Sequence, residues 1–521
     1  MLDKCKKAGS AVIDVIALVL LGLVFAANLI WTCHVSYDDA EIVSYSVSPL
    51  CLVFVPVALL CVYLYAQIAA RADTRKLFRI FSAAYVIAGA YLIFNTEAFI
   101  RADASSVWTA AGTFLKGFFP DLKSDGYLSM FPFQLGMVSY DMLLRLFSDN
   151  VKILYAVNLL EVLVINRLCF RITESLFGDE TVSRIVVLLA FAFVPQLLFI
   201  LFGYGLIPGF CCFMAALYFC IRVYKNAAAK DVLLLILFSV LASLLKPNFK
   251  IGVIAMAIVL LLKPGENGKA YLRLLITAAL VLLCSFASFH LVKLSYSAVS
   301  GADIGGGTPI EVYIAMGTDL DNNVRAPGWY DGYTFSAYPD AGYDTQAAAQ
   351  SAREKIKANL AESAADPARA AGFYWRKMIS TWCEPMFQSA WSGPKGDGLV
   401  AKPLLQSLYT GGSAEKFIGL FSKANVVIIL AASLCFVLTQ RRKYPFARVL
   451  YLYFTGGFLF HLLSETKSQY VYMYIFALLP MAAYELGVWI KLLRGRLKRA
   501  MPRKEEAAQQ ELLEKHHEKN A

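Results

Sequence analysis

Long apolar runs separated by short basic segments dominate the chain. A run of about 20 apolar residues can cross the roughly 30 Å hydrocarbon core of a bilayer as a helix. The pattern therefore predicts an all-α polytopic membrane protein. The apolar runs lie at 11–31, 50–69, 77–95, 131–147, 151–170, 182–201, 205–222, 231–245, 250–263, 272–291, 423–439, 446–463 and 469–491.

One of these runs differs from the others in its polar content. Segment 131–147 begins near Pro132 and contains Gln134, Asp141 and Arg145, so we expect a helix packed inside the protein. About 12 crossings then remain, and some of them, such as 231–245 and 250–263, are short for a full crossing.

Lysine and arginine clusters beside the helix ends predict the orientation, since cytoplasmic loops carry an excess of both residues. With all clusters inside, both termini are cytoplasmic and the loops 32–49, 96–130, 202–205, 246–249, 292–420 and 462–468 lie outside. The clusters are Lys4–Lys7, Arg71–Arg79, Arg167–Arg184, Arg222–Lys230, Lys263–Arg273, Arg441–Arg448 and Lys491–Arg503.

Composition supports a membrane location. Of 521 residues, 58% are hydrophobic and 17% charged, and the mean hydropathy of +0.57 excludes a soluble enzyme. The net charge of +11 then reflects topology, and we expect a lipid bilayer and no nucleic acid as the surroundings. The 11 cysteines lie mostly in apolar runs and are expected to be small core residues.

The predicted organisation has four parts. Residues 1–291 form an N-terminal transmembrane region that includes the outer loop 96–130. Residues 292–420 form a mixed extracytoplasmic loop domain, with two helices broken near Asp366-Pro367. Residues 421–493 supply the C-terminal transmembrane helices, and 494–521 form a charged cytoplasmic tail.

Polar residues with catalytic potential gather in the outer loops. Asp103 precedes an amphipathic stretch, SSVWTAAGTFLKGFF, that suits the membrane interface. Its carboxylate could accept a proton from a hydroxyl, or it could simply cap a helix. Asp38 and Asp39, with Glu41 close by, could act as a base, bind a divalent cation or cap a helix.

Two outer lysines lie at the mouths of apolar helices. Lys246 and Lys467 could neutralise a phosphate at headgroup depth, or they could be snorkelling anchors. His461 and Glu465 flank the second lysine. Asp319 and Asp321 allow a cation without requiring one, and no motif demands a cofactor. Walker, dinucleotide-binding and HExxH motifs are missing, which argues against ATP-driven transport and zinc proteolysis.

An ordered set of short motifs resembles the GT-C superfamily of membrane glycosyltransferases, and more closely the bacterial branch related to protein mannosyltransferases. The motifs are Asp103 with VWTAAGTF, YLSMFPFQLG (127–136), LLRLFSDN (143–150), LLKPNF (244–249), EVYIAMGT (311–318) before GWYDGY (328–333), and HLLSETKSQYVYMYIFALLP (461–480).

The resemblance implies a GT-C-like bundle that transfers a sugar from a polyprenyl-phosphate donor to a glycan, lipid or protein acceptor. Catalysis would occur on the extracytoplasmic face of a cell membrane. Asp103 would be the catalytic base, while Arg101, Lys246 and Lys467 would hold the donor phosphate. A secondary acidic or acceptor site would draw on Asp38, Asp39, Tyr127, Gln134, His461 and Glu465.

The chain departs from the family pattern at two positions. Leu206 stands where relatives often have an acidic residue, and Gln469 stands where they commonly have arginine. Two other interpretations therefore stay open: a transporter or flippase of lipid-linked saccharides, and a noncatalytic scaffold. Inverted repeats and midplane charges, which are typical of transporters, are not evident in the sequence.

Overall fold

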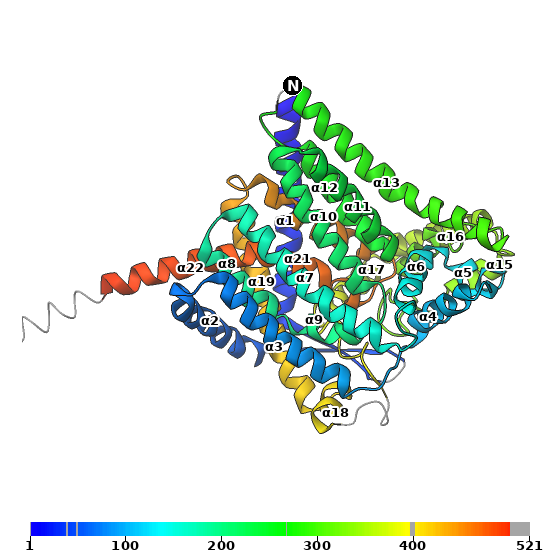
Figure 1. Ribbon diagram of the computed structural model, residues 1–521, viewed down its shortest axis with the longest axis horizontal. Helices are drawn as coiled ribbons and strands as arrows, with labels where there is room; N and C mark the ends of the chain where they lie inside the picture. Colours follow the sequence, from blue (N-terminus) through cyan, green and yellow to red (C-terminus); the bar gives the residue numbers. More distant parts are fainter. Residues whose placement is uncertain (1, 38–39, 48–49, 267, 396–401, 501–521) are drawn as a thin grey trace, which may run out of the picture.

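The computed structural model describes residues 2–37, 40–47, 50–266, 268–395 and 402–500. Helices account for most of this part of the chain (Figure 1). A single two-stranded antiparallel sheet occurs in it, formed by β1 (Trp31–Val35) and β2 (Val43–Val47).

Eight helices in the described ranges are long and apolar enough to cross a membrane, and two bent helix pairs bring the number to ten. The chain is therefore a mainly helical, multi-pass membrane protein. The eight helices are α1 (Leu2–Ile30), α2 (Leu50–Ile68), α3 (Thr74–Phe94), α7 (Lys152–Phe177), α10 (Leu206–Asn226), α13 (Gly268–Ser300), α19 (Ser413–Gln440) and α20 (Arg448–Leu463).

Each bent pair has a proline at its break. The pair of α8 (Glu180–Phe191) and α9 (Val194–Leu198) bends by 49° beside Pro195. The pair of α21 (Tyr472–Ala477) and α22 (Leu479–Ala500) bends by 50° beside Pro480. Proline lacks a backbone N–H and crowds the preceding turn, so a helix restarts at this residue more readily than it continues through it.

Three predicted apolar runs form helices too short for a full crossing. The 17-residue α11 (Ala229–Leu245) spans only about 26 Å at 1.5 Å per residue, and α12 (Lys250–Leu261) is shorter. Both lie beside α10 and α13 (Figure 1). The 11-residue α6 (Leu135–Arg145) occupies run 131–147, which we expected not to cross.

Helix α1 defines two opposite ends of the molecule. Lys6 donates a hydrogen bond to the Lys263 carbonyl (2.8 Å) near one end. Asn28, about 33 Å further along the helix, donates to the Trp382 carbonyl (3.1 Å). Other basic clusters also contact one another: Arg184 bonds the Ala72 carbonyl (3.0 Å), Lys491 pairs with Asp179 (2.6 Å) and Arg494 bonds the Ala66 carbonyl (3.0 Å).

Several of the shorter helices gather at the end of α13 that lies away from the N-terminus (Figure 1). The helices α16 and α17 break at Asp366, which accepts a hydrogen bond from the Arg369 amide (3.0 Å), and Pro367 opens α17, as the sequence predicted. The remaining described helices are α4 (Ala102–Leu115), α5 (Tyr127–Met130), α14 (Ile310–Thr318), α15 (Thr334–Asp340), α16 (Thr345–Ala365), α17 (Pro367–Trp382) and α18 (Pro403–Tyr409). The 3-10 turns of the whole chain are η1 (Ala69–Arg71), η2 (Pro120–Leu122), η3 (Pro132–Gln134), η4 (Phe199–Leu201), η5 (Pro247–Phe249), η6 (Pro445–Ala447) and η7 (Ser468–Tyr470).

Lys377, on α17, joins three of these segments. Its side chain is 1% exposed, and its ammonium donates to the carbonyls of Gly317 (2.5 Å), Leu462 (2.9 Å) and Ser464 (2.9 Å). Gly328 packs so closely on the Lys377 stem that a Cβ there would lie 2.6 Å from its Cε. These carbonyls belong to the ends of α14 and α20, where the helix dipole favours a cation.

We predict that Lys377→Met lowers the free energy of unfolding by about 3 kcal/mol, because three buried carbonyls lose their donor while the apolar stem is kept. Thermal unfolding of the purified protein in detergent measures this. Lys357→Met, at an exposed position of α16, is the matched control and should change stability by less than about 0.5 kcal/mol.

Candidate functional site

Backbone hydrogen bonds bring three distant segments to the β1–β2 hairpin. Strand β1 bonds the end of α17 through the Cys33 amide and the Cys383 carbonyl (3.2 Å), and β2 bonds segment 325–330 through the Val43 amide and the Arg325 carbonyl (3.0 Å). The Thr466 amide in turn bonds the Gly328 carbonyl (3.1 Å). Residues after α17, after α14 and after α20 therefore meet at the hairpin loop.

Asp103 lies in the first turn of α4 and faces this meeting point. The residue before it, Ala102, has a φ of 51°, in the left-handed region that non-glycine residues rarely adopt. The Asp103 side chain keeps contact with solvent, yet protein groups surround it closely enough that desolvation raises the pKa of its carboxyl. A hydrogen bond from the Tyr127 hydroxyl opposes this rise, as do the charges of Lys467 and Lys246.

Lys246 follows α11 and is held between aromatic rings. Its ammonium lies 5.3 Å from the ring centroid of Tyr204 and 5.2 Å from that of Tyr470. Burial lowers the pKa of Lys246 to about 8, and the charges of Asp103 and Glu465 oppose this shift. Within the described residues, Lys246 forms no ion pair, so its charge is available to a ligand.

The Tyr204 side chain is held in place by Gln134. The Gln134 side chain is 5% exposed and donates a hydrogen bond to the Tyr204 hydroxyl. Tyr127 also hydrogen-bonds the same hydroxyl. The predicted residues Tyr127 and Gln134 therefore connect Asp103 to the aromatic wall beside Lys246.

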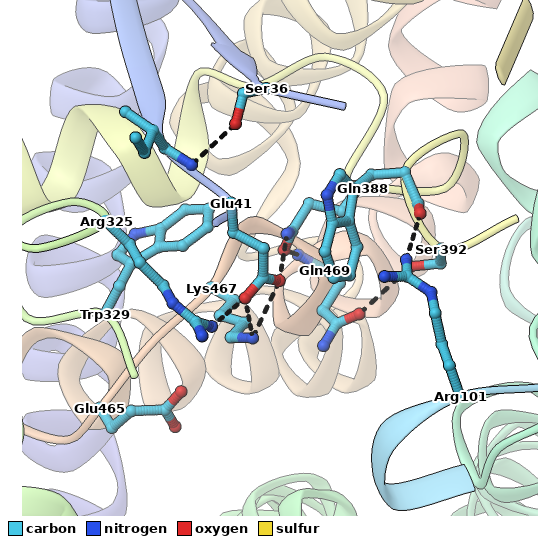
Figure 2. Close-up of polar contacts among 12 residues, drawn as sticks. Ser36, Glu41, Arg101, Arg325, Trp329, Gln388, Ser392, Glu465, Lys467 and Gln469 are labelled. Carbon is cyan, nitrogen blue, oxygen red and sulfur yellow. Dashed lines mark hydrogen bonds and ion pairs between the residues drawn. The ribbon is translucent and has the colours of Figure 1, made fainter. Parts of the chain in front are cut away.

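Lys467 forms a buried ionic cluster with a residue outside the predicted set, Glu41. The Glu41 carboxylate accepts hydrogen bonds from Lys467 (2.7 and 2.9 Å), from Arg325 and from the Gln388 amide (3.1 Å). Figure 2 shows Glu41 between these groups, with Trp329 and Glu465 nearby. Lys467 therefore already has a carboxylate partner in this structure.

Arg101 lies at the other side of Gln388 in the same view (Figure 2). Its guanidinium stacks 3.9 Å from the Trp391 ring centroid and donates to the Trp391 carbonyl (2.6 Å). Next to it, Ser392 donates to Gln469 (3.4 Å), the position at which relatives commonly have arginine. Arg101 is thus anchored to the segment after α17 and contributes positive charge at the rim of the site.

Glu465 and His461 form the buried back of the site. Glu465 is 7% exposed, and desolvation raises the pKa of its carboxyl to about 7, against the opposing charges of Lys467 and Lys377. The His461 ring is 2% exposed and stacks on Tyr470 with centroids 5.6 Å apart. His461 therefore supports the Tyr470 ring that Lys246 contacts.

Two predicted acidic pairs have different outcomes. Asp38 and Asp39 lie outside the described residues. Asp319 and Asp321 are each bonded to a cation, Lys355 (2.9 Å) and Arg369 (2.5 Å) respectively. In the part of the chain that the structure describes, no group of three or more His, Cys, Asp or Glu residues is arranged to hold a metal ion.

Sequence reasoning missed the roles of Glu41, Arg325 and Gln388. Glu41 follows the Asp38-Asp39 pair in an outer loop, which was a usable signal. Arg325 and Gln388 lie in the long loop, more than 280 residues after Glu41 in the chain. Only the hairpin contacts bring these two residues to Glu41.

Comparisons with known proteins do not assign this arrangement to a family. The chain matches no protein-family model, no curated protein and no solved structure.

If Asp103 acts as a base and Lys246 as a cation, activity should follow a bell-shaped pH profile. The acid limb reflects protonation of Asp103 and lies above the usual carboxyl range, because burial raises its pKa. The alkaline limb lies near pH 8, where Lys246 loses its charge.

Lys246→Arg should move the alkaline limb upward by at least about 2 pH units, because a guanidinium stays protonated. A pH–rate profile measures the shift. Lys250→Arg, four residues away and packed on Phe286 (5.0 Å), is the control. An unchanged alkaline limb in Lys246→Arg would contradict the role of Lys246.

Proposed function

We propose that this chain is an integral membrane glycosyltransferase that moves a sugar from a polyprenyl-phosphate donor to an acceptor on the extracytoplasmic face. One observation carries the proposal: the carboxylate of Asp103 lies close enough to the unpaired ammonium of Lys246 for their charges to interact, and the Tyr204 ring lies beside both. A base and a phosphate-binding cation are the two groups that such a transfer needs.

The proposed reaction is a single displacement. The acceptor oxygen attacks the anomeric carbon, the bond from this carbon to the phosphate oxygen breaks, and the acceptor proton passes to Asp103. Because no covalent enzyme intermediate is needed, the anomeric configuration inverts. The departing phosphate gains negative charge, which Lys246 offsets directly, with Lys467 and Arg101 adding to the local positive potential.

The aromatic side chains suit a sugar substrate. Four partly exposed tyrosines lie close enough to Asp103 to interact with its charge. They are Tyr127, Tyr204, Tyr313 and Tyr330. Rings of this kind stack on the apolar faces of sugars, while their hydroxyls bond to the sugar hydroxyls.

The proposed setting is a cell membrane crossed about ten times by a GT-C-like bundle, with both termini cytoplasmic. The contacts that join the basic clusters to one another support this orientation, because positive charge collects on the cytoplasmic side. The site then lies outside, together with the region that spans 292–420. The product would be a cell-surface glycan, glycolipid or glycoprotein, carrying a hexose or pentose.

We predict that Asp103→Asn lowers the transfer rate by about 10²- to 10⁴-fold, because the amide cannot accept the acceptor proton. Transfer of radiolabelled sugar from synthetic polyprenyl-phosphate donors to a membrane extract measures the rate. Asp125→Asn, at an exposed position of the same outer segment, is the control and should retain activity.

Two outcomes would contradict the proposal. Equal rates in wild-type protein and Asp103→Asn would place the base elsewhere. The absence of transfer from every donor, with lipid-linked saccharide instead moving across proteoliposome membranes, would favour a flippase, and the absence of both would favour a scaffold.

A further inference from the structure

The Glu41 carboxylate fills a site built to bind an anion. Its side chain is 2% exposed and accepts hydrogen bonds from two cations and one amide, those of Lys467, Arg325 and Gln388. Two cationic donors and a neutral N–H group are the partners that a phosphate group also selects. A carboxylate in this position therefore competes directly with a phosphate.

The charge balance of the site also indicates that Glu41 competes with a phosphate. Three cations, Lys246, Arg325 and Lys467, lie together with three carboxylates, Asp103, Glu41 and Glu465. With Arg101 at the rim the formal charges sum to only +1, so a phosphate that entered with every group in place would gain less attraction than one that entered after Glu41 had left. Removal of Glu41 alone leaves a surplus positive charge and two cations without a partner.

The backbone around Glu41 is under strain. Glu41 and its partner Gln388 both have a φ of 55°, and Phe387 has a φ of 51°. Non-glycine residues occupy this left-handed region only where surrounding contacts hold them there. Loss of the ionic contacts therefore allows the backbone of the hairpin loop to relax, which favours release of Glu41.

The hairpin allows this movement without unfolding the site. The base of its loop is closed by hydrogen bonds from the Ser36 amide to the Ile42 carbonyl (2.8 Å) and from the Ile42 amide to the Ser36 hydroxyl (2.9 Å). Strand β2 stays bonded to Arg325 through Val43 (3.0 Å). The Glu41 side chain can leave while the cations stay in place.

We propose that Glu41 is an internal placeholder for the donor phosphate: it neutralises Lys467 and Arg325 in the ligand-free protein and is displaced when the phosphate binds. The inference rests on the proposed function, since it takes a lipid phosphate as the ligand. It assigns Arg325 to the phosphate site beside Lys467. It also assigns Glu41 no part as a base, because its carboxylate oxygens are already bonded to Arg325 and Lys467.

In the contrary arrangement, Glu41 stays in place and orients both cations toward the ligand. This arrangement predicts the opposite change in phosphate affinity when Glu41 is substituted. If Glu41 competes with phosphate, then Glu41→Gln should bind phosphate more tightly. If it orients the cations permanently, the same substitution should weaken binding.

The experiment measures binding of farnesyl phosphate to the full-length protein in detergent by calorimetry. Inorganic phosphate and farnesol are the comparison ligands, and they separate the contributions of the phosphate and of the lipid chain. We expect Glu41→Gln to bind farnesyl phosphate about tenfold more tightly than wild-type protein does, with farnesol binding unchanged. Tighter binding of inorganic phosphate as well would assign the same site to free phosphate.

Glu362→Gln is the matched control. It removes the same charge from α16, where Glu362 pairs with Arg369 and contacts neither Lys467 nor Arg325. The two substitutions should give different results, because a general loss of negative charge would tighten binding equally in both. Equal effects, or weaker or unchanged binding in Glu41→Gln, would overturn the placeholder role while leaving the transferase proposal intact. No binding of farnesyl phosphate to any variant would overturn both.

Hydrogen exchange of the wild-type protein tests the inference without a substitution. The Ile42 amide is bonded to the Ser36 hydroxyl in the ligand-free hairpin, so its exchange reports on the Glu41 loop. Saturating farnesyl phosphate should accelerate exchange in the peptide that contains Glu41 and Ile42. Slower exchange would show that the ligand tightens this loop and would overturn the inference.

Discussion

The lipid bilayer accommodates neither an isolated charge nor an unpaired backbone group, and this constraint organises the whole molecule. Several charged residues inside the helices are held by a charged or polar partner, and others collect near the helix ends. Asp14, in α1, illustrates the first solution: it is 7% exposed and bonds Arg448 (2.9 and 3.1 Å) and the Tyr451 hydroxyl (2.5 Å). The candidate site illustrates the second solution, since its charges collect at the end of the bundle where α1 meets the hairpin.

The site depends on a scaffold of buried donors beneath it. Lys377 joins α14, α17 and α20 through three carbonyls, and Asn322 joins the end of α14 to segment 325–330 by donating to the carbonyls of Met316 (3.0 Å) and Trp329 (2.8 Å). These contacts fix the backbone on which Arg325 and Lys467 are carried. Burial of the donors makes each contact costly to break, because no water can replace the lost partner.

Within the site, cations and carboxylates in nearly equal numbers lie close together in a poorly solvated region. Such an arrangement is stable without ligand. Its electrostatic energy changes strongly when a group that enters or leaves alters the charge balance. Among the members, Glu41, Arg325 and Lys467 are ion-paired, whereas Asp103, Lys246 and Glu465 form no ion pair within the described residues. A proton acceptor and an anion-binding cation are thereby left available, while Glu41, Arg325 and Lys467 satisfy one another.

Much of this could be read from the sequence. The length of the apolar runs predicts the long helices, and the polar residues of 131–147 predict a helix that does not cross the membrane. Proline chemistry predicts the helix break at Asp366-Pro367. The helices lie where these rules place them. Asp103, Tyr127, Gln134, Lys246, His461, Glu465 and Lys467 were identified as candidates, and the structure brings them together. The number of crossings was less accessible, because α11 and α12 are apolar yet short, and hydropathy alone does not distinguish a short buried helix from a span.

The sequence by itself determined that the protein is helical and multi-pass, and which loops concentrate polar groups, since these properties depend on residues that are neighbours in the chain. Only the tertiary structure decided which charges are paired. Glu41 contacts Arg325 and Lys467, which are 284 and 426 residues away in the sequence. These contacts depend on the hairpin, whose two strands each form a backbone hydrogen bond to another segment. No local pattern encodes such a meeting, because it arises from the packing of helices whose order in space is independent of their order in the sequence.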